Sequence, residues 1–231
     1  MILTRRLFAA SAALLMLSPA AAAPQKRSAA ADWTKTVVAT PEGGFRMGNP
    51  KAKVKLVEYG SLTCPHCRHF AETAAVGLKA SIKTGRVSFE YRNYILNGID
   101  VAATLVARCG GAPRFFPVVD RFYATQGQWI GKINALSDAD KEAIQAMSDV
   151  DRLKRLAQVG GMVQIAAANG ITPAQSSKCL ADPVGVDRLV GFVEGGRALG
   201  VRGTPTFFVN GTKVEAADWA DLEPYLKQVG G

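Results

Sequence analysis

The sequence predicts an α/β protein in which a long helical block interrupts a single sheet. Three observations carry this prediction. A strand, a helix and a second strand follow one another over residues 53–97. Helical periodicity with few strand signals then extends over residues 98–199, and strand signals return with a hairpin and a helix in residues 200–231. The last segment is therefore expected to complete the sheet that the first one begins.

Residues 1–23 have the pattern of a secretory signal peptide. Arg5 and Arg6 form a positive region, the run from Leu7 to Leu17 is apolar except for one serine, and small residues continue to Ala23. The apolar run is shorter than the roughly 20 residues that a membrane span needs, which favours cleavage over a permanent anchor. We therefore expect a periplasmic protein, and the paired arginines leave both the Sec and the twin-arginine export routes open.

Composition and charge narrow the classes of partner. The 208 residues after position 23 are enough for one domain with a sizeable core, or for a domain with an insertion. The net charge is +9, and +7 without the two signal-peptide arginines. The lysines and arginines are scattered rather than clustered, so we expect a solvated surface and no nucleic-acid partner. Four cysteines in an exported chain are enough for two disulfides, because the compartment is oxidising.

The elements of the first half follow from local patterns. Residues 24–52 are expected to form a loose leader with a possible edge hairpin around a Pro-Glu-Gly-Gly turn. An apolar and β-branched run over residues 54–59 predicts a buried strand. A helix is expected from Pro65 to Thr84, because apolar residues recur at every fourth position and form one stripe. Alternation over residues 87–91 predicts a second strand of the same sheet.

The helical block and the last segment are predicted in the same way. We expect helices over residues 101–109, 114–125, 138–147, 151–168 and 186–199. Breaks are expected at residues 110–113, Gly131, 170–173 and 182–183, and Gly160-Gly161 is expected to kink or split the fourth helix. Asn210-Gly211 between two short β-branched and aromatic runs predicts a hairpin, and an Asp218 cap predicts a final helix that extends to Val229.

The motif Cys64-Pro65-His66-Cys67 lies at the predicted junction between a strand and a helix. Proline is favoured at the first helical position, so Pro65 places Cys64 at the N-cap. There the unpaired backbone N–H groups and the positive end of the helix dipole stabilise a thiolate, and His66 can add a positive charge or a hydrogen bond. Cys67 is one turn further into the helix, where we expect it to be buried and to resolve a mixed disulfide. Stabilisation of the dithiol form makes such a pair an electron acceptor.

A structural disulfide and half of a metal site are the other interpretations of this spacing. Zinc would need two further ligands, but His69 lies on another helical face and the sequence has no second pair of this kind. A disulfide that closes so short a loop would add little stability through chain entropy. We therefore predict a redox-active disulfide, with no metal and no organic cofactor.

The stretch from Glu58 to Cys67 (EYGSLTCPHC), with a later Thr204-Pro205 before a strand, resembles the active-site region of the DsbA-like family of thioredoxin-fold oxidoreductases. The resemblance covers nearly all of the chain after the signal peptide. It implies a thioredoxin fold whose two halves, residues 53–97 and 200–231, flank an inserted helical domain of residues 98–199.

The resemblance also implies roles for individual residues. Pro205 would be cis and face the disulfide, which leaves the backbone of Thr204 free to pair with an incoming peptide. Glu58 matches the buried acid of the family, which could take or relay the proton of the second cysteine; a solvent-facing glutamate at a strand edge is the alternative. Cys109 and Cys179 match a second disulfide that some members carry, and two buried free thiols are the alternative.

The expected activity is that of a thiol:disulfide oxidoreductase that forms disulfides in unfolded or partly folded exported proteins. The resemblance implies reoxidation by a quinone-linked membrane protein. Valine often precedes the cis proline in oxidases of this family, whereas threonine is frequent in its reductases and isomerases, so Thr204 leaves a reductase or isomerase role open. A non-catalytic peptide-binding or chaperone-like module is the third interpretation. The leader is short for a dimerisation module, so we expect a monomer.

Overall fold

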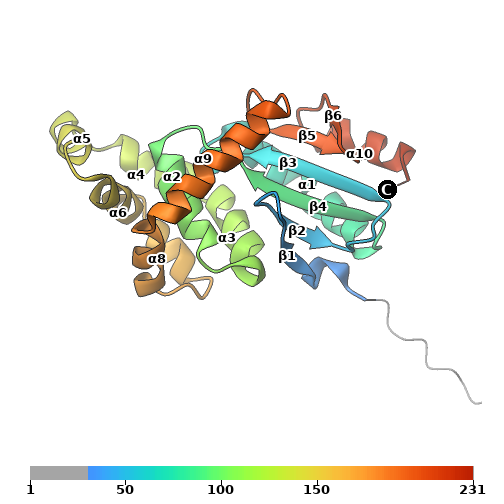
Figure 1. Ribbon diagram of the computed structural model, residues 1–231, viewed down its shortest axis with the longest axis horizontal. Helices are drawn as coiled ribbons and strands as arrows, with labels where there is room; N and C mark the ends of the chain where they lie inside the picture. The colour runs from blue at the N-terminus through green and yellow to red at the C-terminus, as the bar shows by residue number, and fades with distance from the viewer. Residues whose placement is uncertain (1–30, 231) are drawn as a thin grey trace, which may run out of the picture. The chain divides into compact units, whose positions relative to one another are not determined.

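A six-stranded sheet with the strand order β1-β2-β4-β3-β5-β6 forms the centre of the fold (Figure 1). The computed structural model describes residues 31–230, so the signal peptide predicted for residues 1–23 lies outside the described residues. A short 3-10 helix, Trp33–Lys35, precedes the sheet. The strands are β1 (Val37–Ala39), β2 (Phe45–Gly48), β3 (Val54–Gly60), β4 (Val87–Asn93), β5 (Thr206–Val209) and β6 (Thr212–Val214).

Strand β3 pairs with one strand from before the helical block and one from after it. It is parallel to β4, which follows it in the chain, and antiparallel to β5, which comes after the helical block. The remaining pairs, β1 with β2, β2 with β4 and β5 with β6, are antiparallel. The C-terminal hairpin therefore completes the sheet that the first half begins, which confirms the predicted α/β fold.

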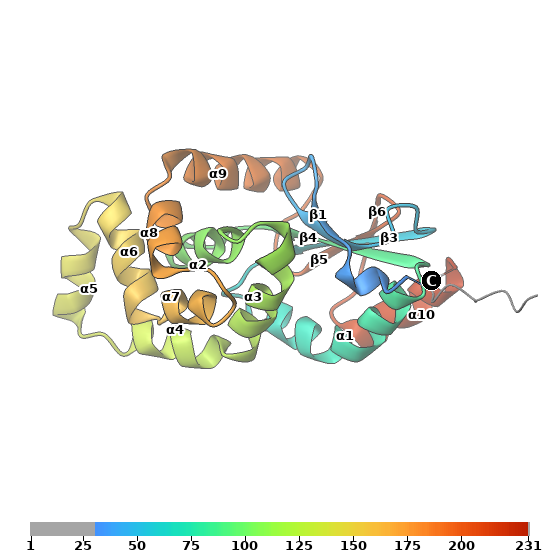
Figure 2. The same cartoon turned by 90° about the horizontal axis from the view of Figure 1, so that it is seen from below.

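Helices cover the two faces of the sheet unequally. α1 (Pro65–Lys83) and α10 (Trp219–Gln228) lie on one face, and α9 (Pro183–Ala198) lies on the other (Figure 2). α1 buries the predicted apolar stripe, whose members are at most 6% exposed: Phe70, Ala74, Leu78 and Ile82. Burial of this stripe fixes the rotation of α1, and therefore the direction in which its first residues point.

The block between β4 and β5 consists of eight helices. These are α2 (Gly98–Arg108), α3 (Ala112–Ala124), α4 (Gln126–Asn134), α5 (Asp138–Gln145), α6 (Asp149–Val159), α7 (Met162–Ala167), α8 (Pro173–Leu180) and α9. The helix predicted over residues 151–168 is split into α6 and α7, because Gly161 adopts the left-handed conformation with φ of 71°. The sequence predicted this break.

The sequence does not predict α4 and α8, and the break expected at Gly131 is wrong because this residue lies within α4. α4 contains two glycines and few helix-favouring residues, so its stability comes from the burial of Trp129 and Ile133 rather than from propensity. α8 has a polar sequence without an apolar period. Its N-terminus is instead closed by a capping box between Thr172 and Gln175.

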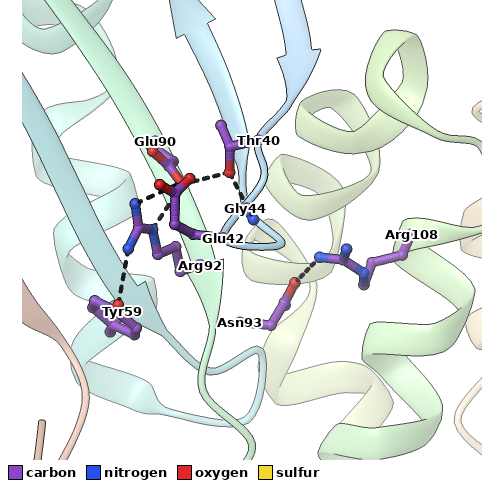
Figure 3. Close-up of polar contacts among 8 residues, drawn as sticks. All are labelled: Thr40, Glu42, Gly44, Tyr59, Glu90, Arg92, Asn93 and Arg108. Carbon is purple, nitrogen blue, oxygen red and sulfur yellow. Dashed lines mark hydrogen bonds and ion pairs between the residues drawn. The ribbon is translucent and has the colours of Figure 1, made fainter. Parts of the chain in front are cut away.

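The sheet face opposite α1 carries a polar network (Figure 3). The Arg92 guanidinium donates to the Glu90 carboxylate over 2.7 Å and to the Tyr59 hydroxyl over 3.0 Å, and the Thr40 hydroxyl donates to the same carboxylate over 2.7 Å. Side chains alternate between the two faces of a strand, so this network is separated by the sheet from Glu58. It links β3 and β4 to the edge hairpin.

Arg108 connects the helical block to the sheet (Figure 3). Its guanidinium donates to the side-chain oxygen of Asn93 over 2.9 Å and lies 4.8 Å and 4.9 Å from the ring centres of Phe45 and Phe192. Burial, and then the nearby charge of Arg188, lower the pKa of Arg108 to about 10.

Within residues 31–230, no helix combines the length and apolar character of a membrane span.

Candidate active site

The cysteine pair lies where β3 gives way to α1. Cys64 is the N-cap of α1 with φ of −80° and ψ of 123°, and Pro65 is the first helical residue. Cys64 is 5% exposed and Cys67 is fully buried, whereas Pro65 and His66 are exposed. Both thiols are free in this structure. The arrangement is the one that the motif predicts, because proline directs the start of the helix to the position after the first cysteine.

The Thr204-Pro205 loop faces Cys64 from the other half of the chain. The peptide bond between the two residues is cis. The Cys64 thiol donates to the Thr204 carbonyl, with 3.2 Å between Sγ and O, across a separation of 140 residues. The Thr204 hydroxyl is buried and has no hydrogen-bond partner among residues 31–230, so it is free to donate to a thiolate.

The environments of the two cysteines differ in a way that separates their pKa values. The pKa of Cys64 is lowered to about 5, mainly by a hydrogen bond from the Cys67 side chain, then by the Thr204 side chain and by the backbone of Cys67 and His66, although burial opposes the shift. The pKa of Cys67 is raised well above its ordinary value, first by burial, then by its hydrogen bond to Cys64 and by the charge of Glu58. The structure therefore makes Cys64 the acidic thiol and Cys67 the thiol that keeps its proton.

Glu58 lies beneath the pair on the same face of β3 as the buried core. It is 2% exposed, which excludes the solvent-facing alternative, and its register partners are Tyr91 on β4 and Phe207 on β5. Burial first, and the charge of Cys64 second, raise the pKa of Glu58 to about 8, although a hydrogen bond with Cys67 opposes the shift. Glu58 is therefore largely neutral at pH 7 and can exchange a proton with Cys67.

Three side chains outside the predicted site hold the loop before α1, and all three come from the helical block. Asp100 on α2 accepts from the Leu62 N–H over 3.1 Å, and the Tyr123 hydroxyl on α3 donates to the Ser61 carbonyl over 3.1 Å. Gln126 on α4 donates from Nε2 to the carbonyls of Leu62 and Cys64, over 2.9 Å each. All three side chains are at most 4% exposed.

Of these three, only Asp100 carries a sequence signal. Asn97 caps α2 by accepting from the Asp100 N–H, which is a common pattern at a helix start. The pattern locates Asp100 on the helix but does not indicate that its carboxylate reaches the loop of another element. Burial raises its pKa to about 6, although hydrogen bonds with Ser61 and the backbone of Leu96 and Leu62 oppose the shift.

The second cysteine pair is joined in the structure. Cys109 at the end of α2 and Cys179 on α8 form a disulfide with an S–S length of 2.02 Å and a Cα–Cα distance of 5.9 Å.

His69 lies on the surface, with its Nε2 3.8 Å from a carboxylate oxygen of Asp218. Within residues 31–230, no group of three or more histidine, cysteine or acidic side chains is placed to hold a metal ion.

Sheet order, a cysteine pair at a helix start and a cis-proline loop opposite it together define a thioredoxin-fold protein with an inserted helical domain. The chain belongs to the thioredoxin family, because the family model described as "Thioredoxin" matches residues 40–228. The solved structures that it resembles include DsbA proteins, as the sequence predicts.

Two curated relatives are similar to most of this chain. Proteins of Rickettsia bellii and Rickettsia typhi, each named "Putative protein-disulfide oxidoreductase", are 29% and 28% identical to 78% and 83% of this chain. The alignments cover 62% and 63% of those proteins, so the chain spans about three fifths of the length of the curated relatives it matches.

Two solved structures illustrate the similarity of fold. The crystal structure of a protein-disulfide isomerase from Novosphingobium aromaticivorans is 29% identical, with a TM-score of 0.74, and the match covers 80% of this chain and 97% of that one. The crystal structure of Wolbachia pipientis alpha-DsbA1 is 20% identical, with a TM-score of 0.58, and the match covers 83% and 92% of the two chains. The second similarity concerns the fold alone.

Proposed function

We propose that this protein is a periplasmic thiol:disulfide oxidoreductase that forms disulfides in exported proteins. The observation that carries the proposal is the placement of the two thiols: Cys64 caps α1 beside the cis-proline loop, where its pKa is lowered to about 5, and Cys67 is fully buried, where its pKa is raised. An acidic Cys64 stabilises the dithiol form, and a pair with a stabilised dithiol form accepts electrons from other thiols.

The exchange follows from the exposure of the two sulfurs. In the oxidised protein, a substrate thiolate attacks Sγ of Cys64, the Cys64–Cys67 bond breaks, and Cys67 leaves with the electron pair. A second substrate thiolate then attacks the substrate sulfur of the mixed disulfide, and Cys64 leaves as a thiolate. The substrate loses two electrons and gains a disulfide, and the cysteine pair is reduced.

Neighbouring groups stabilise Cys67 and Cys64 as leaving groups in the two steps. The low pKa of Cys64 makes it a good leaving group in the second step. Cys67 is buried and basic after the first step, and the neutral carboxyl of Glu58 is placed to give it a proton. The backbone at Thr204, beside the cis proline, is the position where an extended substrate segment would lie against Cys64.

The proposal is tested by equilibrating the Cys64–Cys67 pair with glutathione and then oxidising a reduced model substrate. We expect an oxidising pair and stoichiometric transfer of a disulfide to the substrate. A strongly reducing pair without oxidase activity would refute the proposal. A Cys67→Ala variant should trap substrates as mixed disulfides on Cys64, and an empty trap would favour a peptide-binding module without redox activity.

Isomerisation is the second candidate function. Thr204 precedes the cis proline where oxidases of the family often have valine, and the similar Novosphingobium protein is named as an isomerase. An isomerase would restore activity to a model protein with scrambled disulfides when supplied as the dithiol. Comparison of this rate with the oxidation rate of the same reduced model protein would assign the dominant activity.

Location, partners and oligomeric state complete the proposal. Export of the chain should remove residues 1–23, which N-terminal sequencing of the protein from a periplasmic fraction tests. Repeated turnover needs an external oxidant, for which we propose a quinone-linked membrane protein, and no metal or organic cofactor is needed at the pair. We expect a monomer by sedimentation.

A further inference from the structure

Gln126 contacts the backbone of the reactive cysteine itself. Its Nε2 donates to the carbonyl of Cys64 and to the carbonyl of Leu62, both over 2.9 Å. We propose that Gln126 is a positioning residue for thiol–disulfide exchange, which holds the peptide group of Cys64 so that its sulfur stays between the helix start and the cis-proline loop. The inference rests on the proposed function and adds to it a residue of the helical block.

The geometry uses the full donor capacity of this amide. A glutamine side chain has two N–H donors, and here each has one backbone carbonyl as its partner. Gln126 is 4% exposed and Leu62 is fully buried, so the amide lies in the protein interior. The Cys64 carbonyl also accepts the first helical hydrogen bond of α1, from the Arg68 N–H over 3.2 Å. The amide therefore spans the loop and the first turn of the helix.

Holding this carbonyl fixes the backbone of Cys64, from which the side chain with its sulfur projects. Cys64 has an extended backbone at the N-cap, and rotation about its ψ angle would move the carbonyl away from Gln126. In the observed conformation Sγ lies near the backbone N–H groups of His66 and Cys67 and 3.2 Å from the Thr204 carbonyl. The two N–H groups stabilise a thiolate only while the sulfur faces them, so loss of the amide should weaken their effect.

The position of Gln126 in the fold makes it a link between the helical block and the site. Thr125 is at once the C-cap of α3 and the N-cap of α4, and Gln126 is the first residue of α4. Trp129, one turn further along α4, is 1% exposed and donates from its indole N–H to the Phe122 carbonyl over 2.9 Å. The start of α4 is therefore held by packing that is independent of the cysteine loop.

The test compares variants with two, one and no donors at this position. Gln126→Met keeps the length of the side chain without donors, and Gln126→Glu provides one donor, because a buried carboxyl at pH 7 is favoured in its neutral form. Gln128→Met is the matched control, since Gln128 is exposed on the same helix. The readouts are the pH titration of thiolate ultraviolet absorbance in the reduced protein and the equilibrium constant with glutathione.

We expect Gln126→Met to raise the pKa of Cys64 by about one unit, which corresponds to about a tenfold change in the ionisation constant. Gln126→Glu should have an intermediate effect, and Gln128→Met should titrate like the wild type. A folded Gln126→Met protein with the wild-type titration and glutathione equilibrium would overturn the inference. If that variant does not fold, a wild-type titration of Gln126→Glu would overturn it.

The two proposals fail in different ways. A wild-type protein that does not exchange disulfides with any thiol would refute the proposed function, whereas the titration would still report whether Gln126 holds Cys64. Exchange by the wild type together with an unchanged titration in both Gln126 variants would refute only the positioning role.

Discussion

The low pKa of Cys64 predicts how the redox equilibrium of the pair should respond to pH. The folded dithiol has a pKa of about 5 where an ordinary cysteine has 9.0, so between these values the folded protein binds fewer protons at this site than an unperturbed thiol does. The stabilisation of the dithiol is therefore complete above pH 9 and is lost as the pH falls through 5. At pH 7 it amounts to at most about 2.7 kcal/mol, since one pKa unit corresponds to about 1.36 kcal/mol.

Solvent at the edge of the site screens these interactions and reduces the stabilisation to about half, or about 1.4 kcal/mol. For a two-electron pair, about 1.4 kcal/mol corresponds to about 30 mV, so the acidic thiol should make the potential about 30 to 60 mV more oxidising at pH 7. At pH 5 the same relation gives a stabilisation of the dithiol of only about 0.4 kcal/mol, so most of the shift in potential should disappear.

The assay is a titration of thiolate absorbance in the reduced protein from low to high pH, with Cys64→Ser as the control. We expect one ionisation with a midpoint near pH 5 that is absent from the variant. Equilibration with a dithiol buffer at pH 7 and pH 5 then measures the difference between the reduction potential of the Cys64–Cys67 pair and that of the buffer at each pH. A Cys64 thiol that ionises near pH 9 would refute the reasoning, because the local groups would then have no net effect on it.

Three further predictions concern stability. Burial raises the pKa of Glu58 from 4.5 to about 8, so its contribution to stability is complete below pH 4.5, where the carboxyl is neutral, and is lost as the pH rises through 8. Over this range the free energy of unfolding of the reduced wild type should fall by up to about 5 kcal/mol relative to that of Glu58→Gln. A constant difference between the two proteins at all pH values would contradict this. Replacement of both Cys109 and Cys179 by alanine should lower the free energy of unfolding by about 2 to 5 kcal/mol while thiol exchange at the active site continues; equal denaturation midpoints would count against a stabilising disulfide. Gly60→Ala should destabilise the protein by about 1 to 3 kcal/mol, because its Cβ would lie 2.6 Å from a tyrosine ring, whereas Gly98→Ala, with open space around it, is the control that should change little.

The cysteine pair shows how far local sequence patterns reach. The apolar stripe of α1 and the proline after Cys64 are local features, and they place the thiol at the helix start as observed. The same reasoning misses α4 and α8, because these helices form through burial of Trp129 and through a capping box rather than through apolar periodicity. The site residue Gln126 is missed with them, since it is the first residue of α4.

Glu58 illustrates what resemblance can and cannot supply. Its position before the motif suggests a buried acid, and the structure buries it between β4 and β5. The size of its pKa shift depends on the surrounding core and on the charge of Cys64, which no local pattern contains.

The sequence by itself determined the strand–helix–strand unit, the helix start at Cys64 and the kind of chemistry that two cysteines at this spacing support, because caps and apolar periods act between residues close in the chain. Only the tertiary structure decided how acidic Cys64 is and what holds it in place. The Thr204 carbonyl is 140 residues away from Cys64 in the chain, and Gln126 is 62 residues away. Hydrogen bonds and burial of this kind exist only after the two halves of the sheet and the helical block have packed together, so no local pattern can encode their geometry.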